Sequence, residues 1–598
     1  MEREGASSES LLPTQRPEPP SWYQRSRTYI WERIYYYYCL LDPEEEPTGT
    51  AYYVWITVLV LIGVVMGLTS VGILLFVIGE PTNDERELSA KPEAPSDYCS
   101  NGFPREFIWG LGTAAYQIEG GNTKSGRQPS IWDDFSHQPN KVYASPFAPA
   151  SHGGSPDHGD TGDVACDHYH RFREDVDLMR AIGLKHYRFS ISWSRVMSYD
   201  EKSNQMVPNE AGLKWYDDLL DALEEAGVTP YVTLYHWDLP SAIHEHLGGW
   251  HTPDNALVID EFVKYATLCF ERFGKRVGFW VTFNEPWSFA LEGYDSGKSA
   301  PGCAPYEQER PTGRCKHGGT VVYIVAHNVL NAHAAAAKAF HEVYQPKNGG
   351  TISITLNCEF SFALNGTDTA DVKAAERANE FMLGWWLQPL LTGDYPKVMR
   401  EFVGERLPTF TEEQSQLLIG SIDVLALNHY SSHLVSEADD EWLARGGSGW
   451  CTWADDMRLI STVSPDWPVG ESVWEHAYAP GMRALLNWAA GPESKYWPGK
   501  PVYITENGWS CHSMTAEDGK DDWQQVDYFA SYIEQIRLAM VEDMVNVTGY
   551  FGWSLLDNYE WSDGYSKRFG LFFVDYETQK RTPKKAALWW NESRRCEL

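Results

Sequence analysis

From residue 99 onward, short apolar runs alternate with longer helical patterns, and this alternation constrains the fold more than any other feature. The candidate strands are Phe107–Gly112, His186–Ile191, Thr229–Tyr235, Phe279–Phe283, Thr351–Leu356, Val424–Asn428, Val502–Thr505 and Gly549–Ser554. The helical patterns are Tyr169–Ile182, Ala211–Ala226, Ala256–Phe273, Val321–Val343, Ala370–Leu391, Glu412–Ile419, Pro480–Ala489 and Val526–Val541. Such alternation predicts β/α units and a parallel sheet.

Eight such strands favour an α/β fold of one particular kind. Spread over residues 99–598, they suit a closed (β/α)8 barrel, the TIM barrel, with long loop insertions. The alternative is a doubly wound open sheet, which usually carries a glycine-rich phosphate-binding turn after its first strand. The sequence has no such turn in usable form, so the barrel is the favoured prediction.

Two of the candidate strands lead into a glutamate. Glu285 follows Phe279–Phe283 by two positions, and Glu506 follows Val502–Thr505 directly. In a parallel barrel, chemistry takes place where the strands end at their carboxyl termini. Two carboxylates at one rim suit glycosidic bond cleavage, with one as acid/base and the other as nucleophile or water activator. Either glutamate alone could simply cap a loop, whereas the pair favours catalysis.

Composition limits the classes of partner. Aromatic residues make up 14% of the chain, with 26 Trp and 33 Tyr, which suits a site where sugar faces stack on rings, although most of these residues fill a large core. The formal net charge of −34 argues against nucleic acid or anionic lipid as the main partner. A neutral small-molecule substrate is expected, and the oligomeric state stays open.

The first 98 residues predict a membrane anchor. Residues 1–50 are polar, proline-rich and acidic, which indicates a disordered tail. Residues 51–79 contain no charged side chain and exceed the ~20 residues that span a bilayer as a helix. The run is too long and begins too late for a cleaved signal peptide. A buried soluble helix is the alternative. Residues 80–98, with prolines and mixed charges, read as a stalk.

Basic residues predict the orientation of the span. Arg25, Arg27 and Arg33 precede it, which mildly favours a cytosolic amino terminus. We therefore expect a single-pass type II membrane protein with its catalytic domain, residues 99–598, on the lumenal or extracellular side.

Translocation would make two kinds of modification possible. Three glycosylation sequons begin at Asn365, Asn546 and Asn591. Cys303 and Cys315, joined by a loop rich in proline and glycine, form the most plausible local disulfide. Cys166, between apolar neighbours, is the candidate for a buried free thiol.

Seven motifs occur in order along the chain. They are Phe107-Ile108-Trp109-Gly110 with Gln117-Ile118-Glu119-Gly120, Gly159–Tyr169, Tyr187-Arg188-Phe189-Ser190, His236–Pro240, Thr282–Pro286, Ile504–Gly508 and Trp553–Trp561. Together they resemble the motifs of glycoside hydrolase family 1, the β-glucosidase family, over residues 103–590. The resemblance implies a (β/α)8 barrel and a reaction that retains the configuration of the anomeric carbon.

The resemblance also implies roles for individual residues. It makes Glu285 the acid/base and Glu506 the nucleophile. Arg188 and the Tyr430 hydroxyl are the groups that we expect against the nucleophile, and Asn284 is expected to bind the sugar 2-hydroxyl. The implied sugar clamp and stacking residues are Gln117, His236, Glu560, Trp561, Trp553 as the floor, and Trp474 as a leaving-group platform.

Several alternatives remain at this stage. The expected activity is that of a retaining β-glycosidase, specifically a β-glucosidase. Its sugar is expected to be unphosphorylated, because the glutamate at position 560 would repel a 6-phosphate. Transglycosylation at the same site, or a non-catalytic glycan-binding module on the same barrel, are the alternatives. No metal or cofactor is expected, since the resemblance assigns the cluster Asp160, Asp163, Asp167, His168 and His170 to a loop and a helix cap.

Overall fold

A computed structural model describes residues 99, 101–146, 148–153, 159–303, 319–439, 441–442, 452–511 and 513–593. The predicted tail (1–50), membrane span (51–79) and stalk (80–98) lie outside these ranges. Within the described ranges, none of the helices combines the length and the apolar character needed to cross a bilayer.

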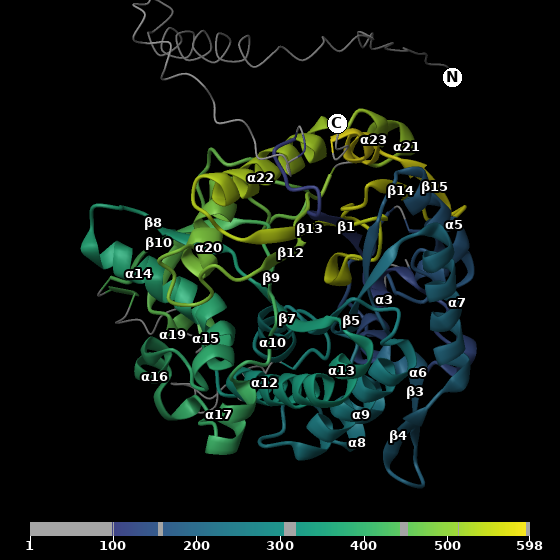
Figure 1. Cartoon of the computed structure of the whole chain (residues 1–598), viewed down its shortest axis with the longest axis horizontal. Coiled ribbons are helices and arrows are strands. Elements are labelled where there is room, and N and C mark those ends of the chain that lie inside the picture. Colours follow the sequence, from purple (N-terminus) through teal and green to yellow (C-terminus); the bar gives the residue numbers. More distant parts are fainter. Residues whose placement is uncertain are drawn as a thin grey trace, which may run out of the picture. The chain divides into compact units, whose positions relative to one another are not determined.

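Eight parallel strands close into a barrel (Figure 1). They are β1 (Ile108–Gly112), β2 (His186–Ser190), β5 (Thr229–Tyr235), β6 (Phe279–Asn284), β7 (Thr351–Asn357), β9 (Leu425–Asn428), β12 (Val502–Glu506) and β13 (Val547–Trp553). Each strand pairs with its neighbour in chain order, and β1 pairs with both β2 and β13, which completes the ring. All eight predicted strands are present to within about two residues at their ends, and the barrel is confirmed.

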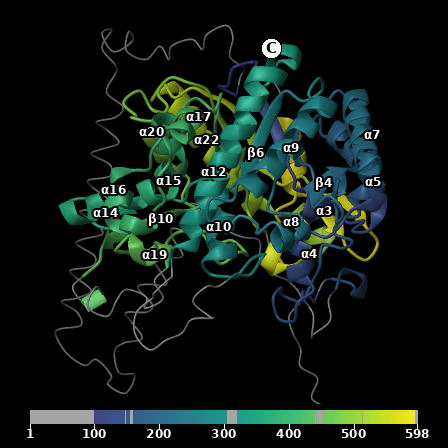
Figure 2. The same cartoon turned by 90° about the horizontal axis from the view of Figure 1, so that it is seen from below.

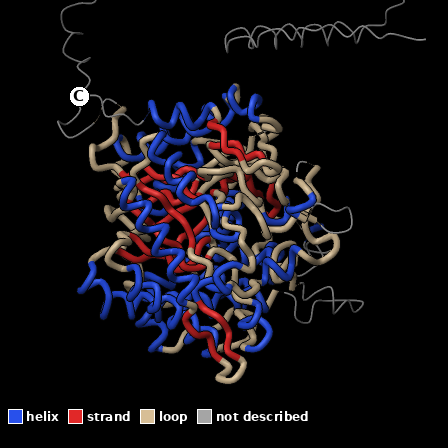
Figure 3. Tube along the Cα trace, turned by 90° about the vertical axis from the view of Figure 1, so that its right-hand side faces the viewer, coloured by secondary structure: helices blue, strands red, loops and turns tan. Residues whose placement is uncertain are grey.

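Helices cover the outside of the barrel, whose strands lie in the interior of the molecule (Figure 3). The longer ones are α5 (His168–Ala181), α7 (Glu210–Ala226), α9 (Ala256–Phe273), α12 (Val321–Ala339), α14 (Thr369–Asn379), α15 (Trp385–Thr392), α20 (Pro480–Ala490) and α22 (Trp523–Val541). The helices α9 and α12 lie side by side (Figure 2). On α7, Leu213, Tyr216 and Leu220 are buried, so the predicted apolar face does contact the barrel layer.

Two of the predicted helices are interrupted. A π-helical turn at Phe340–Tyr344 ends α12, and another at Glu380–Gly384 separates α14 from α15. An apolar periodicity cannot reveal such a change in backbone hydrogen bonding, because the buried face continues through it. The shorter helices are α3 (Ala115–Ile118), α4 (Ile131–Ser136), α6 (Trp193–Val196), α8 (Ser241–His246), α10 (Pro286–Tyr294), α13 (Gln345–Asn348), α16 (Lys397–Val403), α17 (Glu412–Leu418), α19 (Trp453–Asp456), α21 (Ala516–Lys520) and α23 (Lys585–Ser593).

Loop insertions carry three small sheets. One has the order β11 (Leu459–Thr462), β10 (Ser432–Glu437) and β8 (Phe360–Ala363). Its strands belong to the segments of the chain that follow β7 and β9. The other two are hairpins, β3 (Met197–Asp200) with β4 (Gln205–Pro208) and β14 (Phe572–Asp575) with β15 (Lys580–Pro583). The predicted long insertions are therefore confirmed.

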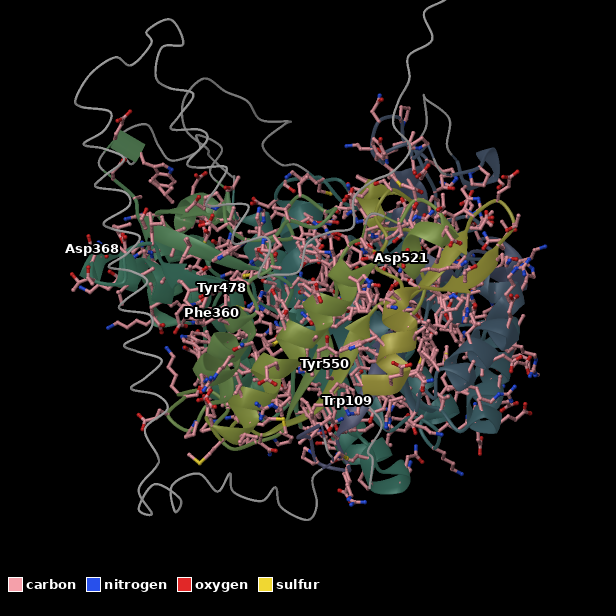
Figure 4. The ribbon with its side chains drawn as sticks, turned by 90° about the horizontal axis from the view of Figure 1, so that it is seen from above. Trp109, Phe360, Asp368, Tyr478, Asp521 and Tyr550 are labelled. Carbon is pink, nitrogen blue, oxygen red and sulfur yellow. The ribbon has the colours of Figure 1, made fainter. Side chains whose placement is uncertain are left out.

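Large side chains from several strands fill the barrel. Tyr231, Phe279, Val281 and Phe551 form one buried cluster. Gly110 of β1 makes room for it, since a Cβ at this position would lie 2.2 Å from an atom of the Phe551 ring. One residue earlier on each of these two strands, Trp109 of β1 contacts Tyr550 of β13 with ring centroids 5.9 Å apart (Figure 4). The barrel is thus a packed core and its chemistry is confined to the rim.

The predicted Cys303–Cys315 disulfide falls partly outside the described residues. Cys303 is partly buried and packs against the apolar core, whereas Cys315 lies outside the described ranges. A bond between them stays a prediction. Cys166 is a buried free thiol, as predicted, and Cys99 is disulfide-bonded.

The sequon asparagines are accessible. Asn365 and Asn546 are exposed, and Asn591 is partly exposed on α23. Their glycosylation stays a prediction.

Candidate active site

The residues predicted for catalysis gather at one rim of the barrel because each follows or ends a strand. Glu506 is the last residue of β12, and Glu285 directly follows β6. The pairing register shifts between Val281 and Asn284 on β6 and between Ile504 and Glu506 on β12. Irregularities of this kind re-aim side chains next to active sites. Both glutamates therefore lie just past a point where the regular ladder breaks.

The Glu506 carboxylate is held by two donors. Arg188 Nη1 donates to Oε1 over 2.5 Å, and the Tyr430 hydroxyl donates to Oε2 over 2.8 Å. Arg188 is almost fully buried, so this ion pair is shielded from water. Burial and the nearby Glu506 charge raise the pKa of Tyr430 well above its ordinary value, which keeps the hydroxyl protonated and donating. Both oxygens of Glu506 are therefore held by hydrogen-bond donors, and one of the donors is a buried cation.

The Glu285 carboxyl has the opposite electrostatic setting. Burial, reinforced by the negative charge of Glu506, raises the pKa of Glu285 to about 8. Asn428 Nδ2 donates to its Oε1 over 2.6 Å, and Ser288 Oγ donates to its Oε2 over 2.7 Å, and both contacts oppose the rise. At neutral pH the side chain holds a proton, as an acid catalyst must.

A continuous hydrogen-bond chain joins the two carboxyl groups. From Glu506 it passes to Arg188, whose Nη2 donates to Asn284 Oδ1 over 2.7 Å. Asn428 Nδ2 donates to the same oxygen over 3.2 Å and also reaches Glu285. The predicted acid and nucleophile thus belong to one site.

Two further residues contact the acid, Asn428 and Ser288, and neither was predicted from the sequence. Asn428 is the last residue of β9, a position that the strand-end reasoning could have selected. Ser288 lies on the first turn of α10, which starts at Pro286 directly after the acid, and its hydroxyl also accepts a bond from Asn357. No pattern along the chain distinguishes Ser288 from any other helical serine.

Asn284 fixes the state of His236. Because Asn284 Oδ1 accepts from Arg188 and Asn428, its Nδ2 is the donor to His236 Nε2 at 3.2 Å. Burial, with the Arg188 charge, lowers the pKa of His236 well below its ordinary value, so the ring is neutral. Its Nδ1 then carries the proton, and this atom is buried without a hydrogen-bond partner among the described residues. The binding of a sugar hydroxyl by His236 stays a prediction.

The other predicted sugar-binding residues lie beside His236. The Trp553 and Trp561 rings stack near the imidazole, with centroids 5.8 Å and 5.9 Å away. Gln117 Nε2, from α3, donates to Glu560 Oε2 over 3.4 Å, while Gln117 Oε1 is buried without a hydrogen-bond partner in the described structure. Burial and the neighbouring Asp563 raise the pKa of Glu560 well above its ordinary value.

Trp474 also belongs to this rim. Its ring contacts that of Tyr430 edge-on, with centroids 5.7 Å apart, and stacks near Phe569 at 6.3 Å. The side chain is 41% exposed, in contrast to the buried rings of the sugar clamp. An exposed ring next to the Tyr430 contact of Glu506 suits the leaving-group side.

The acidic cluster near residue 165 has structural partners. Asp160 accepts from the backbone N–H of Tyr565 over 2.9 Å, and His168 pairs with the buried Asp175 over 2.7 Å. Among the described residues, no group of three or more His, Cys, Asp or Glu side chains is arranged to hold a metal ion.

One rim of the (β/α)8 barrel carries two unlike carboxyl groups, a proton-bearing Glu285 and a Glu506 held by a guanidinium and a phenol hydroxyl. Aromatic and polar side chains lie beside them. This arrangement defines a glycosidase-type site.

The profile of glycosyl hydrolase family 1 matches residues 99–597. β-Glucosidase 1B of Phanerodontia chrysosporium is 41% identical over 488 residues, covering 81% of this chain and 84% of that protein. β-Glucosidase 40 of Arabidopsis thaliana is 40% identical over 505 residues, covering 83% and 93%.

Solved structures agree with these relatives. A rice β-glucosidase superposes with a TM-score of 0.73 at 37% identity, covering 82% of this chain and 98% of that one. A family 1 β-glucosidase from the fungus Humicola insolens, in complex with glucose, gives 0.73 at 38% identity with the same coverage. The chain belongs to glycosyl hydrolase family 1.

Proposed function

We propose that this protein is a retaining β-glucosidase that hydrolyses unphosphorylated β-glucosides by double displacement. The observation that carries the proposal is the pair of unlike carboxyl groups at one rim, a proton-bearing Glu285 and a carboxylate Glu506 held by Arg188 and Tyr430. The names of the relatives support glucose as the sugar.

In the first step Glu506 attacks the anomeric carbon while Glu285 protonates the departing oxygen. Tyr430 and Arg188 each donate to one oxygen of Glu506, and together they keep its carboxylate from rotating out of the attacking position. Asn284, fixed by Arg188 and Asn428, lies where it can bind the 2-hydroxyl, a contact that strengthens in the transition state. A covalent glycosyl-enzyme results.

In the second step Glu285 reverses its role. Esterification removes the charge of Glu506, which is one of the two causes of the high pKa of Glu285. The pKa of Glu285 therefore falls, and the ionised side chain accepts a proton from the attacking water. Two inversions restore the original configuration of the sugar.

Several groups support a neutral sugar. Arg568, which could otherwise attract a phosphate, is held in a buried ion pair with Asp557 at 2.8 Å. The Glu560 carboxyl stands next to Gln117, where a 6-phosphate would meet an acidic group in place of a cation.

The anomer of the first product tests this function. NMR recorded during hydrolysis of an aryl β-glucoside should show β-glucose appearing before mutarotation. Release of α-glucose first would contradict double displacement, and equal rates for the wild type and Glu506→Gln would rule out the assigned nucleophile.

We also propose that residues 51–79 anchor the enzyme as a type II membrane protein. The uncharged run and the preceding arginines support this placement. Alkaline carbonate extraction of membranes should leave the full chain in the pellet and release a version that lacks residues 1–98. Recovery of both in the supernatant would contradict the anchor.

A further inference from the structure

A fully buried carboxyl group lies next to the exposed Trp474, and the catalytic steps do not use it. The Glu475 side chain has 0% exposure, whereas Trp474 is 41% and Val473 82% exposed. Neighbouring residues thus point to opposite sides, with the apolar pair at the rim and the carboxyl inside. Burying a carboxyl group is costly unless it is hydrogen-bonded, so the contacts of Glu475 need an explanation.

Glu475 joins two loops of the active site. Its Oε2 accepts a bond from the backbone N–H of Ser510 over 2.9 Å and another from the Ser510 hydroxyl. Ser510 lies four residues after Glu506, in the loop that follows β12. The same serine binds Glu471 and Ser472 through its backbone oxygen and its hydroxyl. One residue of the nucleophile loop therefore binds three residues around Trp474, two before it (Glu471 and Ser472) and one after it (Glu475).

The segment from residue 468 to 477 is a tight hairpin closed around this carboxyl. Val469 and His476 pair as an antiparallel bridge, and the Gly470 N–H donates to the Glu475 carbonyl over 3.0 Å. A Cβ on Gly470 would lie 2.1 Å from Glu475 Oε2, so only glycine lets the side chain fold under the hairpin. We define this segment as the Trp474 hairpin.

The hairpin is also fixed on its other side. The Ser431 hydroxyl donates to the Trp474 carbonyl over 3.2 Å and accepts from the His476 N–H over 2.8 Å. Ser431 follows Tyr430, the residue that binds the nucleophile. At the hairpin's end, Tyr478 packs against Phe362 of β8, close to Phe360 (Figure 4).

From these contacts we infer that Glu475 is a positioning residue that sets leaving-group selectivity by fixing the Trp474 hairpin to the nucleophile loop. The inference rests on the proposed function. Glu475 touches no reacting atom, so it acts only on substrates whose leaving group is large enough to reach the Trp474 ring. Loss of the carboxyl removes the two bonds that Ser510 donates to Glu475 and loosens the hairpin, although the bonds of Ser510 to Glu471 and Ser472 remain, and it leaves the carboxyl pair of the site unchanged.

A comparison of two glucosides tests the inference. β-Glucosyl fluoride has a leaving group too small to reach Trp474, whereas the bicyclic aglycone of 4-methylumbelliferyl β-glucoside does reach it. For Glu475→Ala we expect kcat/KM for the aryl glucoside to fall roughly threefold to tenfold through KM, the range of one aromatic contact. The value for the fluoride should not change. Glu475→Gln, whose amide oxygen still accepts from Ser510, should behave like the wild type.

Two further variants separate positioning from general damage. In the Trp474→Ala variant, adding Glu475→Ala should cause no further loss of kcat/KM for the aryl glucoside, because Glu475 acts only by positioning the Trp474 ring. Glu380→Gln is the matched control, since Glu380 is a buried acceptor for Tyr496 on the outer helices, and it should alter neither substrate. If the Glu475→Ala variant does not fold, the same two substrates are compared with Ser510→Ala, which removes the hydroxyl that donates to Glu475.

Equal losses for the two substrates, or additive losses with Trp474→Ala, would overturn the inference. A wild-type enzyme that leaves glucosyl fluoride intact would instead refute the proposed function, so the two failures are distinguishable.

Discussion

At the scale of single residues, environment gives two identical side chains different tasks. Glu506 faces a guanidinium and a phenol, while Glu285 faces an amide and a serine hydroxyl in a dry setting. Cationic and hydroxyl donors favour charge, whereas burial beside a second carboxylate favours the neutral acid. The assignment of acid and nucleophile therefore follows from their contacts as well as from the family.

The first prediction concerns pH. The pKa of Glu285 is raised to about 8, above its ordinary value, so the protonated acid persists through neutral pH and is lost as the pH rises through about 8. We expect kcat/KM for an aryl glucoside to decline on the alkaline side with an apparent pKa close to that value. A profile that stays flat to pH 10 would contradict the assignment.

The second prediction concerns the leaving group. Glu285→Gln cannot donate a proton, so poor leaving groups suffer most. Removal of general acid catalysis costs roughly 100- to 10,000-fold for alkyl glucosides, and much less for dinitrophenyl glucoside. The ratio of the two kcat/KM values measures the effect. Equal slowing of both substrates would show that Glu285 does not act as the acid.

At the scale of elements, the strand ends determine the site. Asn428 of β9 donates to Asn284 and Glu285 at the end of β6, and its Oδ1 accepts a bond from the Thr505 hydroxyl of β12 over 2.7 Å, so β9 links these two strands. Neighbouring strands of a parallel barrel thus deliver a complete network to one rim.

The third prediction tests this link. Asn428 donates to Glu285 and thereby lowers the pKa of that carboxyl, so its loss should raise the pKa further. In Asn428→Ala the alkaline limb of kcat/KM should move up by about one pH unit, as for loss of one charge-assisted hydrogen bond. Ser288→Ala removes the second donor and should shift the limb in the same direction. A downward shift in either variant would be incompatible with this account.

Elements also show what sequence can and cannot predict. The strands and their terminal glutamates were predictable because apolar runs with turn residues are local signals. Arg188 lies in one of the seven listed motifs, whereas Tyr430 lies in none of them. Asn428, Ser288 and Glu475 were not identified, because their roles depend on partners from other strands and loops.

At the scale of the whole molecule, the packed barrel interior supports the rim. Phe551, Tyr231 and Phe279 contact one another inside the ring, and Gly110 of β1 gives them room. Because these rings lie below the catalytic network, a defect there should weaken folding before it alters chemistry.

The fourth prediction follows from that packing. Phe551→Ala removes a fully buried ring and should lower the free energy of unfolding by about 3–5 kcal/mol. Leu588→Ala, at an exposed position on α23, should change it by less than about 0.5 kcal/mol. Chemical denaturation of residues 99–598 compares the two. Similar losses in both variants would mean that the barrel interior is not the stabilising core.

Covalent trapping tests the central claim most directly. A 2-deoxy-2-fluoroglucoside with an activated leaving group slows both steps of double displacement, but breakdown of the intermediate remains the slower one, so the glycosyl-enzyme accumulates. Mass spectrometry of the digested enzyme should then find one fluoroglucosyl group, attached to Glu506. Attachment to Glu285, or turnover without any labelled peptide, would contradict the assignment of nucleophile and acid at this rim.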